Sequence, residues 1–157
     1  MLAQTLTEKL DHFYELTYHE MVQFIEEIEK GEIEKDCGPK DFIKIQKIIA
    51  HLARIGTPKE DLPAIEKELQ EMEKYNHPKQ ILDEILADLS ITFSKKYNKN
   101  QVTEAIENIN WILKYHKEFE ITEPQLQALK QFRTHLKKHP NSTKIKTHLK
   151  QLLLILS

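Results

Sequence analysis

The sequence predicts an all-α protein, with six to seven amphipathic helices arranged in an antiparallel bundle or a short helical-hairpin stack. Its residues with apolar side chains recur at steps of three and four along nearly the whole chain, which is the spacing of a helix with one buried face. No segment of the sequence shows the strict alternation of a half-buried strand. The connections between the periodic segments are short, which favours antiparallel neighbours.

The first predicted helix is the longest and covers about residues 3–30. One seam follows the helical spacing through Leu6, Leu10, Phe13, Thr17, Met21, Phe24 and Ile28. The stretch GEIEKDCGP then interrupts the pattern, so residues 31–39 are predicted to form the longest loop.

The later helices are shorter, and turn signals separate them. We expect them over about residues 40–55, 60–75, 78–97, 100–119, 123–138 and 142–156. The TPKE segment at 57–60 has the form of a capping box with proline at the first helical position, although Pro63 would move the start of this helix to Asp61. Thr122, followed by Pro124, is expected to open the helix over 123–138.

The length of 157 residues suits one helical domain spanning residues 1–157. A domain of this size buries about 70% of the surface that its unfolded chain exposes, so it can fold without metals or disulfides. The chain contains only three glycines, and none is spaced to form a phosphate-binding loop. A nucleotide-binding loop is therefore not expected, and no cofactor is predicted.

The sequence also predicts a cytoplasmic protein. Cys37 is the only cysteine, so no disulfide can form within the chain and nothing requires an oxidising compartment. Charged residues occur early in the N-terminal segment, which is not typical of a secretory signal. The longest unbroken apolar run covers residues 152–156, far short of the about 20 residues of a membrane span, so no transmembrane segment is expected.

Charge is distributed unevenly along the chain. All 25 aspartates and glutamates lie within residues 1–123, and residues 124–157 contain basic residues without any acidic one. The basic residues of this segment are Lys130, Arg133, Lys137, Lys138, Lys144, Lys146 and Lys150. Three of them, Lys130, Arg133 and Lys137, are spaced to share one helical face. A short echo, THLK at 134–137 and again at 147–150, is too short to indicate a repeat.

The last predicted helix ends in the apolar stretch LLLIL. Its core seam is expected to consist of Ile145, Leu149, Leu152 and Leu156, while Leu153 and Leu154 lie off this seam. A helix that is apolar nearly all round is normally buried, so the last turn either plugs the bundle or forms an interface with a partner or a second copy of the chain. A helix lying on a membrane surface is a third interpretation, for which the stretch is short.

These patterns favour a non-enzymatic protein–protein interaction module, such as an adaptor, a chaperone, an inhibitor or an immunity-type protein. No catalytic motif is recognisable in the sequence. The predicted contact surface is basic and apolar and comprises Lys130, Arg133, Lys137, Lys138, Lys146, Lys150, Leu153 and Leu154. Its partner is expected to be a protein that is acidic at the contact, because complementary charge speeds and orients encounter.

Three alternatives to this interpretation stay open. The basic helices could be neutralised by acidic helices of the same chain. The same face could bind nucleic acid or acidic phospholipid, although the net charge of −2 argues against a nucleic-acid protein. The C-terminal helix could also form a homo-oligomer.

Two further groups of residues are candidates for function. The second predicted helix carries a basic stripe of Lys40, Lys44, Lys47, His51 and Arg54. On the first predicted helix Glu8, His12, Glu15 and His19 share one face, and their spacing would allow metal ligation. The Glu-x-x-His pair of di-iron bundles is absent, and this face lies opposite the apolar seam, so a solvated face is the favoured interpretation.

Overall fold

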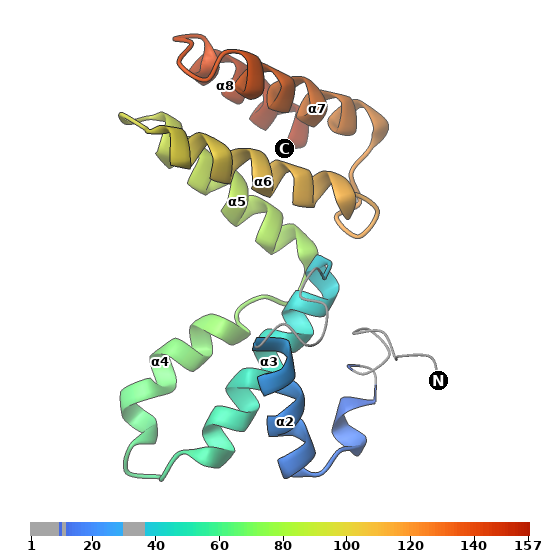
Figure 1. The fold of residues 1–157 in the computed structure, drawn as a ribbon, viewed down its shortest axis with the longest axis vertical. Coiled ribbons are helices and arrows are strands. Elements are labelled where there is room, and N and C mark those ends of the chain that lie inside the picture. The colour runs from blue at the N-terminus through green and yellow to red at the C-terminus, as the bar shows by residue number, and fades with distance from the viewer. Residues whose placement is uncertain (1–9, 11, 30–36) are drawn as a thin grey trace. The chain divides into compact units, whose positions relative to one another are not determined.

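The computed structural model describes residues 10, 12–29 and 37–157, and it confirms the all-α class. These residues form one short 3-10 helix and seven α-helices, and none of them lies in a strand (Figure 1). No helix in this part of the chain is long and apolar enough to cross a membrane.

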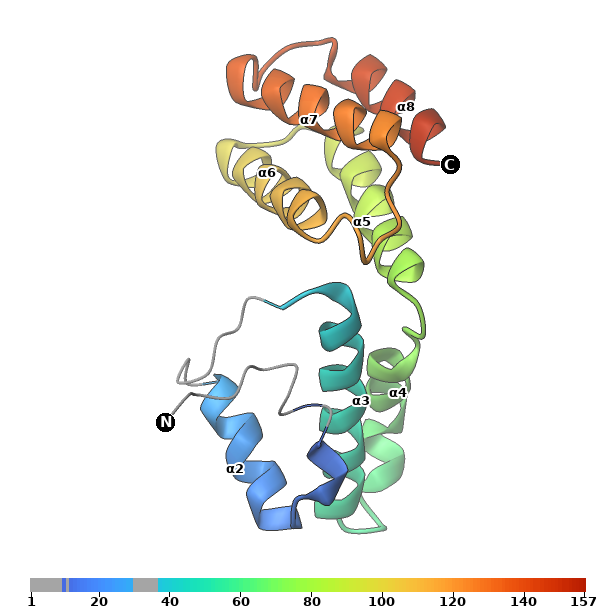
Figure 2. The same cartoon turned by 90° about the vertical axis from the view of Figure 1, so that its right-hand side faces the viewer.

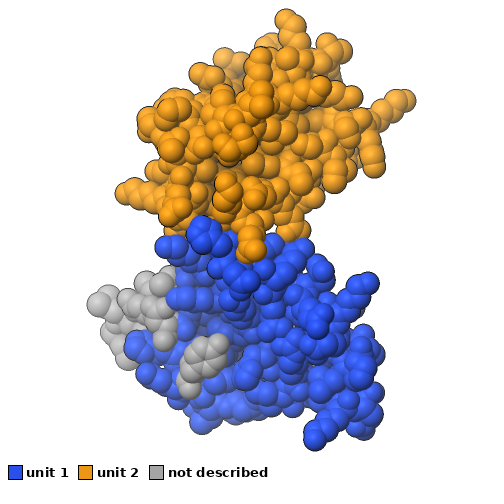
Figure 3. Space-filling model, turned by 180° about the vertical axis from the view of Figure 1, so that it is seen from behind, with its two compact units in different colours: residues 1–77 blue, residues 78–157 orange. Residues whose placement is uncertain are grey.

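The chain divides into two compact units, unit 1 (residues 1–77) and unit 2 (residues 78–157), which Figure 3 colours separately. The boundary falls between His77 and Pro78, and Pro78 is the first residue of the helix that opens unit 2. Proline suits this position because the first amides of a helix have no intrahelical acceptor. The expectation of a single domain stays a prediction.

Unit 1 contains the 3-10 helix η1 (Phe13–Glu15) and the helices α2 (Tyr18–Glu29), α3 (Pro39–Gly56) and α4 (Leu62–Glu73). α3 packs against both α2 and α4 and lies between them (Figure 2). α4 begins after Asp61, the later of the two starts that the sequence allows, because Pro63 occupies its first turn. Residues 31–36 of the predicted loop lie outside the described residues.

The prediction of one continuous helix over residues 3–30 is wrong between His12 and Thr17. η1 occupies Phe13–Glu15, and Leu16 is extended, with φ −82° and ψ 151°. α2 begins after Thr17, whose hydroxyl accepts a hydrogen bond from the Glu20 amide at 3.3 Å. The Thr17 amide donates in turn to Glu20 Oε1 at 3.2 Å, which completes a capping box.

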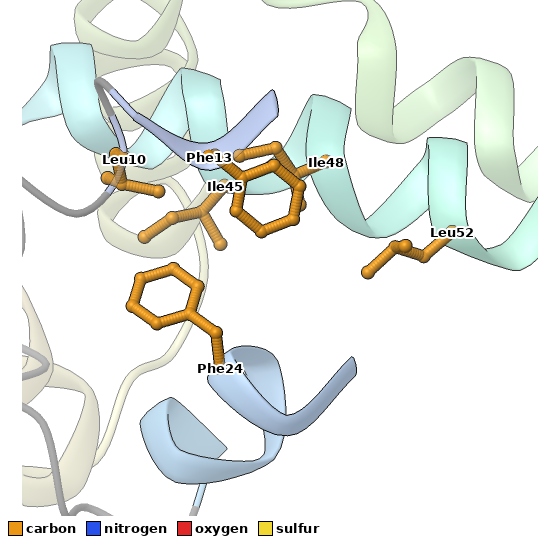
Figure 4. Close-up of a cluster of buried hydrophobic side chains, with 6 residues drawn as sticks. All are labelled: Leu10, Phe13, Phe24, Ile45, Ile48 and Leu52. Carbon is orange, nitrogen blue, oxygen red and sulfur yellow. The ribbon is translucent and has the colours of Figure 1, made fainter. Parts of the chain in front are cut away.

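Apolar side chains from both sides of this interruption of the helix are buried in one cluster. Leu10 and Phe13 pack into a cluster with Phe24 of α2 and with Ile45, Ile48 and Leu52 of α3 (Figure 4). Phe13 is fully buried, and its ring lies 5.9 Å from that of Phe24, centroid to centroid. Burying such a side chain stabilises the fold by about 1.5–3 kcal/mol, which offsets the helical hydrogen bonds lost at the break.

Unit 2 contains α5 (Pro78–Phe93), α6 (Lys99–Lys114), α7 (Glu123–Lys138) and α8 (Ile145–Leu156). Each helix packs against the next, and α8 returns to contact α5, so the four helices enclose one core. The core includes Phe93, Ile109, Ile112, Leu129, Leu136 and Ile145, each at most 1% exposed. This arrangement agrees with the predicted antiparallel bundle.

Helix ends in unit 2 follow local capping and side-chain packing. α7 covers the predicted residues 123–138, and the Thr122 hydroxyl accepts a hydrogen bond from the Gln125 amide. α5 ends at Phe93 rather than at 97, because Tyr97 leaves the helix and packs its ring edge-on against Phe93 at 4.9 Å. α6 ends at Lys114 rather than at 119, and α8 starts at Ile145 rather than at 142.

Candidate functional site

The candidate site is the surface of α7 and α8, which lie side by side in Figures 1 and 2. Both helices bury one seam in the core of unit 2, as the sequence predicts. On α8 this seam consists of Ile145, Leu149, Leu152 and Leu156, each no more than 6% exposed. The remaining side chains of the two helices are therefore free to define an outer surface.

The outer surface is cationic. Lys130, Lys137, Lys138, Lys146 and Lys150 are exposed, whereas Arg133 is half-buried and donates a hydrogen bond from Nη1 to Asn110 Oδ1 of α6 at 2.8 Å. Within the part of the chain that the structure describes, no lysine or arginine of residues 124–157 forms an ion pair with a carboxylate. The α7–α8 lysines are therefore not neutralised by contact with a described carboxylate.

The apolar residues of the site divide into buried and exposed members. Leu153 is half-buried, while Leu154 is 76% exposed and Ile155 is 45% exposed. Ile155 is not among the residues predicted for the contact surface. Its backbone carbonyl also accepts a hydrogen bond from Gln125 Nε2 of α7 at 3.1 Å. The last turn of α8 thus both closes the core and presents apolar side chains to solvent.

A groove of about 480 Å³ runs between α7 and α8. Phe132, Leu152 and Ile155 contribute apolar surface to it, and Lys130 and Lys138 contribute positive charge. Three histidines also line it: His135 on α7, His139 at the C-terminal cap of α7, and His148 on α8. The groove therefore combines apolar, cationic and titratable groups in one place.

The three imidazole rings are close together. The centroid of the His135 ring lies 4.2 Å from that of His148 and 5.5 Å from that of His139. Nε2 of His135 is buried and has no hydrogen-bond partner among the described residues. Burial lowers the pKa of His135, and the electrostatic influence of the basic neighbours His148, His139 and Lys144 lowers this pKa further.

Sequence reasoning missed this histidine cluster, although one signal was present. The repeated THLK stretch places His135 and His148 one residue before a core leucine of each helix, Leu136 and Leu149. Equivalent positions on two adjacent antiparallel helices can meet if the turn between them sets the right register. The repeated THLK sequence therefore indicates equivalent positions for His135 and His148. Only the packing of α7 against α8 shows that their rings are in contact.

The second candidate stripe on α3 has a different environment. Arg54 is half-buried and pairs with two carboxylates of α4, those of Glu66 at 2.6 Å and of Glu73. The hydrogen bond from Arg54 lowers the pKa of Glu66. Lys40, Lys44 and His51 are exposed and Lys47 is half-buried. One end of this stripe is thus neutralised within unit 1.

The proposed metal-ligating face of the first helix is broken by the extended Leu16. His12 Nδ1 lies 3.5 Å from Glu15 Oε2, and His19 belongs to α2 beyond the break, so the three residues do not share one helical face. Glu8 lies outside the described residues. Among the residues that the structure describes, no group of three or more histidine, cysteine, aspartate or glutamate side chains is placed to hold a metal ion.

Comparison with known proteins adds no functional assignment. No family model, curated protein or solved structure matches the chain. The fold and the site thus define the protein only by class, as an all-α chain whose second unit presents a basic and apolar helical pair.

Proposed function

We propose that this protein is a non-enzymatic interaction module that binds an acidic protein partner through the outer surface of α7 and α8. An adaptor, a chaperone, an inhibitor or an immunity-type protein would each act in this way. The proposal places the protein in the cytoplasm, on the sequence grounds given above.

The observation that carries the proposal is the combination of unpaired lysines with exposed apolar side chains on one helical pair. Lys130, Lys138 and Lys150 are exposed and form no ion pair with a described carboxylate. Leu154 and Ile155 expose apolar surface on α8. Interfaces place apolar side chains where water is excluded and charges at the rim, where they orient the encounter.

The proposal is tested by affinity capture from the native host with the full chain as bait, at low and at moderate salt. The test variant combines Lys130→Glu, Lys138→Glu and Lys150→Glu. Arg133 is left intact because its hydrogen bond to Asn110 links α7 to α6, and its loss would confuse binding with stability. The matched control combines Lys59→Glu, Lys67→Glu and Lys95→Glu, which are also exposed and change the net charge equally.

A captured protein that the control retains and the test variant loses supports the proposal. Equal capture by both variants would show that the α7–α8 surface is not the contact. If the captured material is nucleic acid or anionic lipid, and its binding weakens steeply with salt, the alternative function replaces the proposed one, because phosphate contacts release counterions.

A further inference from the structure

The histidine cluster between α7 and α8 has a feature that the general basic surface does not explain. Its members come from two helices and the turn between them, and all three line the groove. His135 Nε2 is buried and finds no acceptor or donor in the described chain.

The surroundings of the cluster lack negative charge. The charged and titratable groups that act on His135 are His148 of α8, His139 of the turn and Lys144 at the N-terminal cap of α8, and all are basic. Lys130 and Lys138 of α7 line the same groove. Neither α5 nor α6 contributes a carboxylate to this set, and residues 124–157 contain none.

We propose that the His135–His139–His148 cluster is a binding site for one oxyanion, a carboxylate or a phosphoryl group carried on a side chain of the partner. The oxyanion accepts a hydrogen bond from the imidazoles and balances the charge of Lys138 and Lys144. It supplies the two things that the cluster lacks, an acceptor for His135 and a negative charge.

The shape of the groove favours a group carried on a side chain over a free ion. Its volume of about 480 Å³ is much larger than one small anion requires. Phe132, Leu152 and Ile155 offer apolar surface beside the imidazoles, against which the stem of an acidic side chain can pack. This inference rests on the proposed function, because the acidic side chain is taken to belong to the protein partner. The histidine cluster would then be the place where that side chain binds.

Binding at this site is linked to protonation. An oxyanion stabilises the charged imidazole of His135, so binding favours protonation of this ring. The affinity for the oxyanion therefore rises as the pH falls toward the lowered pKa of His135, by up to about tenfold per pH unit for the proton taken up.

The site is tested on the isolated 157-residue chain with small anions, so that its failure and that of the proposed function are distinguishable. NMR follows the imidazole signals during titration with sulfate, which keeps its charge in this pH range and stands in for a phosphoryl group. A second arm uses acetate for a carboxylate. Chloride at matched ionic strength is the reference in both arms.

We expect sulfate, acetate or both to shift the signals of His135 and His148 and to raise the pKa of His135, with no change at His51 of unit 1. The response should be lost in His148→Gln and retained in His51→Gln. Lys138→Gln, at an exposed position, should weaken the response even if His148→Gln fails to fold. A response in one arm alone identifies the class of oxyanion.

The absence of a selective response in both arms overturns the site, whatever the capture experiment shows. A response that is equal at His51 and at His135 overturns it as well, because it would report ionic strength rather than binding. Conversely, a positive response together with failed capture would retain the site and remove the proposed protein partner.

Discussion

The imidazole rings of His135 on α7 and His148 on α8 lie 4.2 Å apart, centroid to centroid, in a part of unit 2 without acidic neighbours. This pair couples the packing of the two helices to the protonation of His135. A neutral pair can stay in contact at this distance, whereas two charged rings repel each other and have no carboxylate to balance them.

The first prediction is that acidification destabilises unit 2. Burial and basic neighbours lower the pKa of His135 in the folded protein, so the unfolded chain binds a proton at higher pH than the folded one does. The contribution of His135 to the free energy of unfolding is therefore fully present above the pKa of about 6.5 that histidine has in the unfolded chain. This contribution is lost as the pH falls toward the lowered pKa of His135 in the folded protein. Urea denaturation at about pH 7.5 and about pH 5.5, in a chloride buffer, measures the difference.

The control for this prediction is His135→Gln, which removes the titrating ring. The loss of stability between the two pH values should be smaller in this variant than in the natural chain. A loss of the same size in both proteins would assign the pH dependence to other groups. Adding sulfate to the natural chain should reduce the loss if the cluster binds an oxyanion.

The second prediction concerns the cap of α2. Thr17→Ala removes the hydroxyl that accepts from the Glu20 amide and should destabilise unit 1 by about 1 kcal/mol. Thr57→Ala is the comparison, because sequence reasoning assigns Thr57 to a capping box but its hydroxyl forms no hydrogen bond in the described chain. Chemical denaturation should show a clear shift for Thr17→Ala only, and equal shifts would contradict the assigned cap.

The contrast between these two threonines shows where sequence reasoning succeeds and where it stops. Thr122 opens α7 as predicted, because α7 has a strong apolar period and proline in its first turn. The helical spacing of apolar residues also runs without interruption through Leu10, Phe13 and Thr17, yet the helix is interrupted there by the extended Leu16. The local pattern does not reveal this interruption, at which Phe13 is buried in a cluster with residues of α3.

Some features of the candidate site could be predicted from the sequence and others could not. The excess of lysines follows from the composition, and the core seam of α8 follows from the helical spacing of its apolar residues, so both could be predicted. The meeting of His135 with His148 depends on the register set by the turn over residues 139–144, and no local pattern gives that register. The neutralisation of Arg54 likewise depends on the packing of α3 against α4.

The third prediction tests a link between the two turns at one end of unit 2. The hydroxyl of Tyr97, after α5, donates to the carbonyl oxygen of Pro140, after α7, at 2.9 Å. Tyr97→Phe removes this hydrogen bond but keeps the ring contact with Phe93, so it should cost about 0.5–1.5 kcal/mol. Tyr97→Leu removes both and should cost more in urea denaturation. Equal stability of the natural chain and Tyr97→Phe would show that the hydrogen bond contributes nothing.

The fourth prediction separates the two roles of the last turn of α8. Leu152 is 2% exposed, and Leu152→Ala should destabilise the protein by about 2–5 kcal/mol because it leaves a cavity in the core. Leu154 is 76% exposed, and Leu154→Gln should change stability by less than about 0.5 kcal/mol. Urea denaturation measures both effects.

Leu154→Gln should instead reduce association, because it removes apolar surface from the proposed interface without disturbing the core. Capture of the partner measures this effect, and light scattering of the isolated protein shows whether the same residue joins two copies of the chain. Lower molar mass for Leu154→Gln than for the natural chain would assign Leu154 to a homo-oligomer. If Leu154→Gln keeps both full capture and an unchanged molar mass, the apolar part of the proposed interface is wrong, and the lysines alone would have to account for binding.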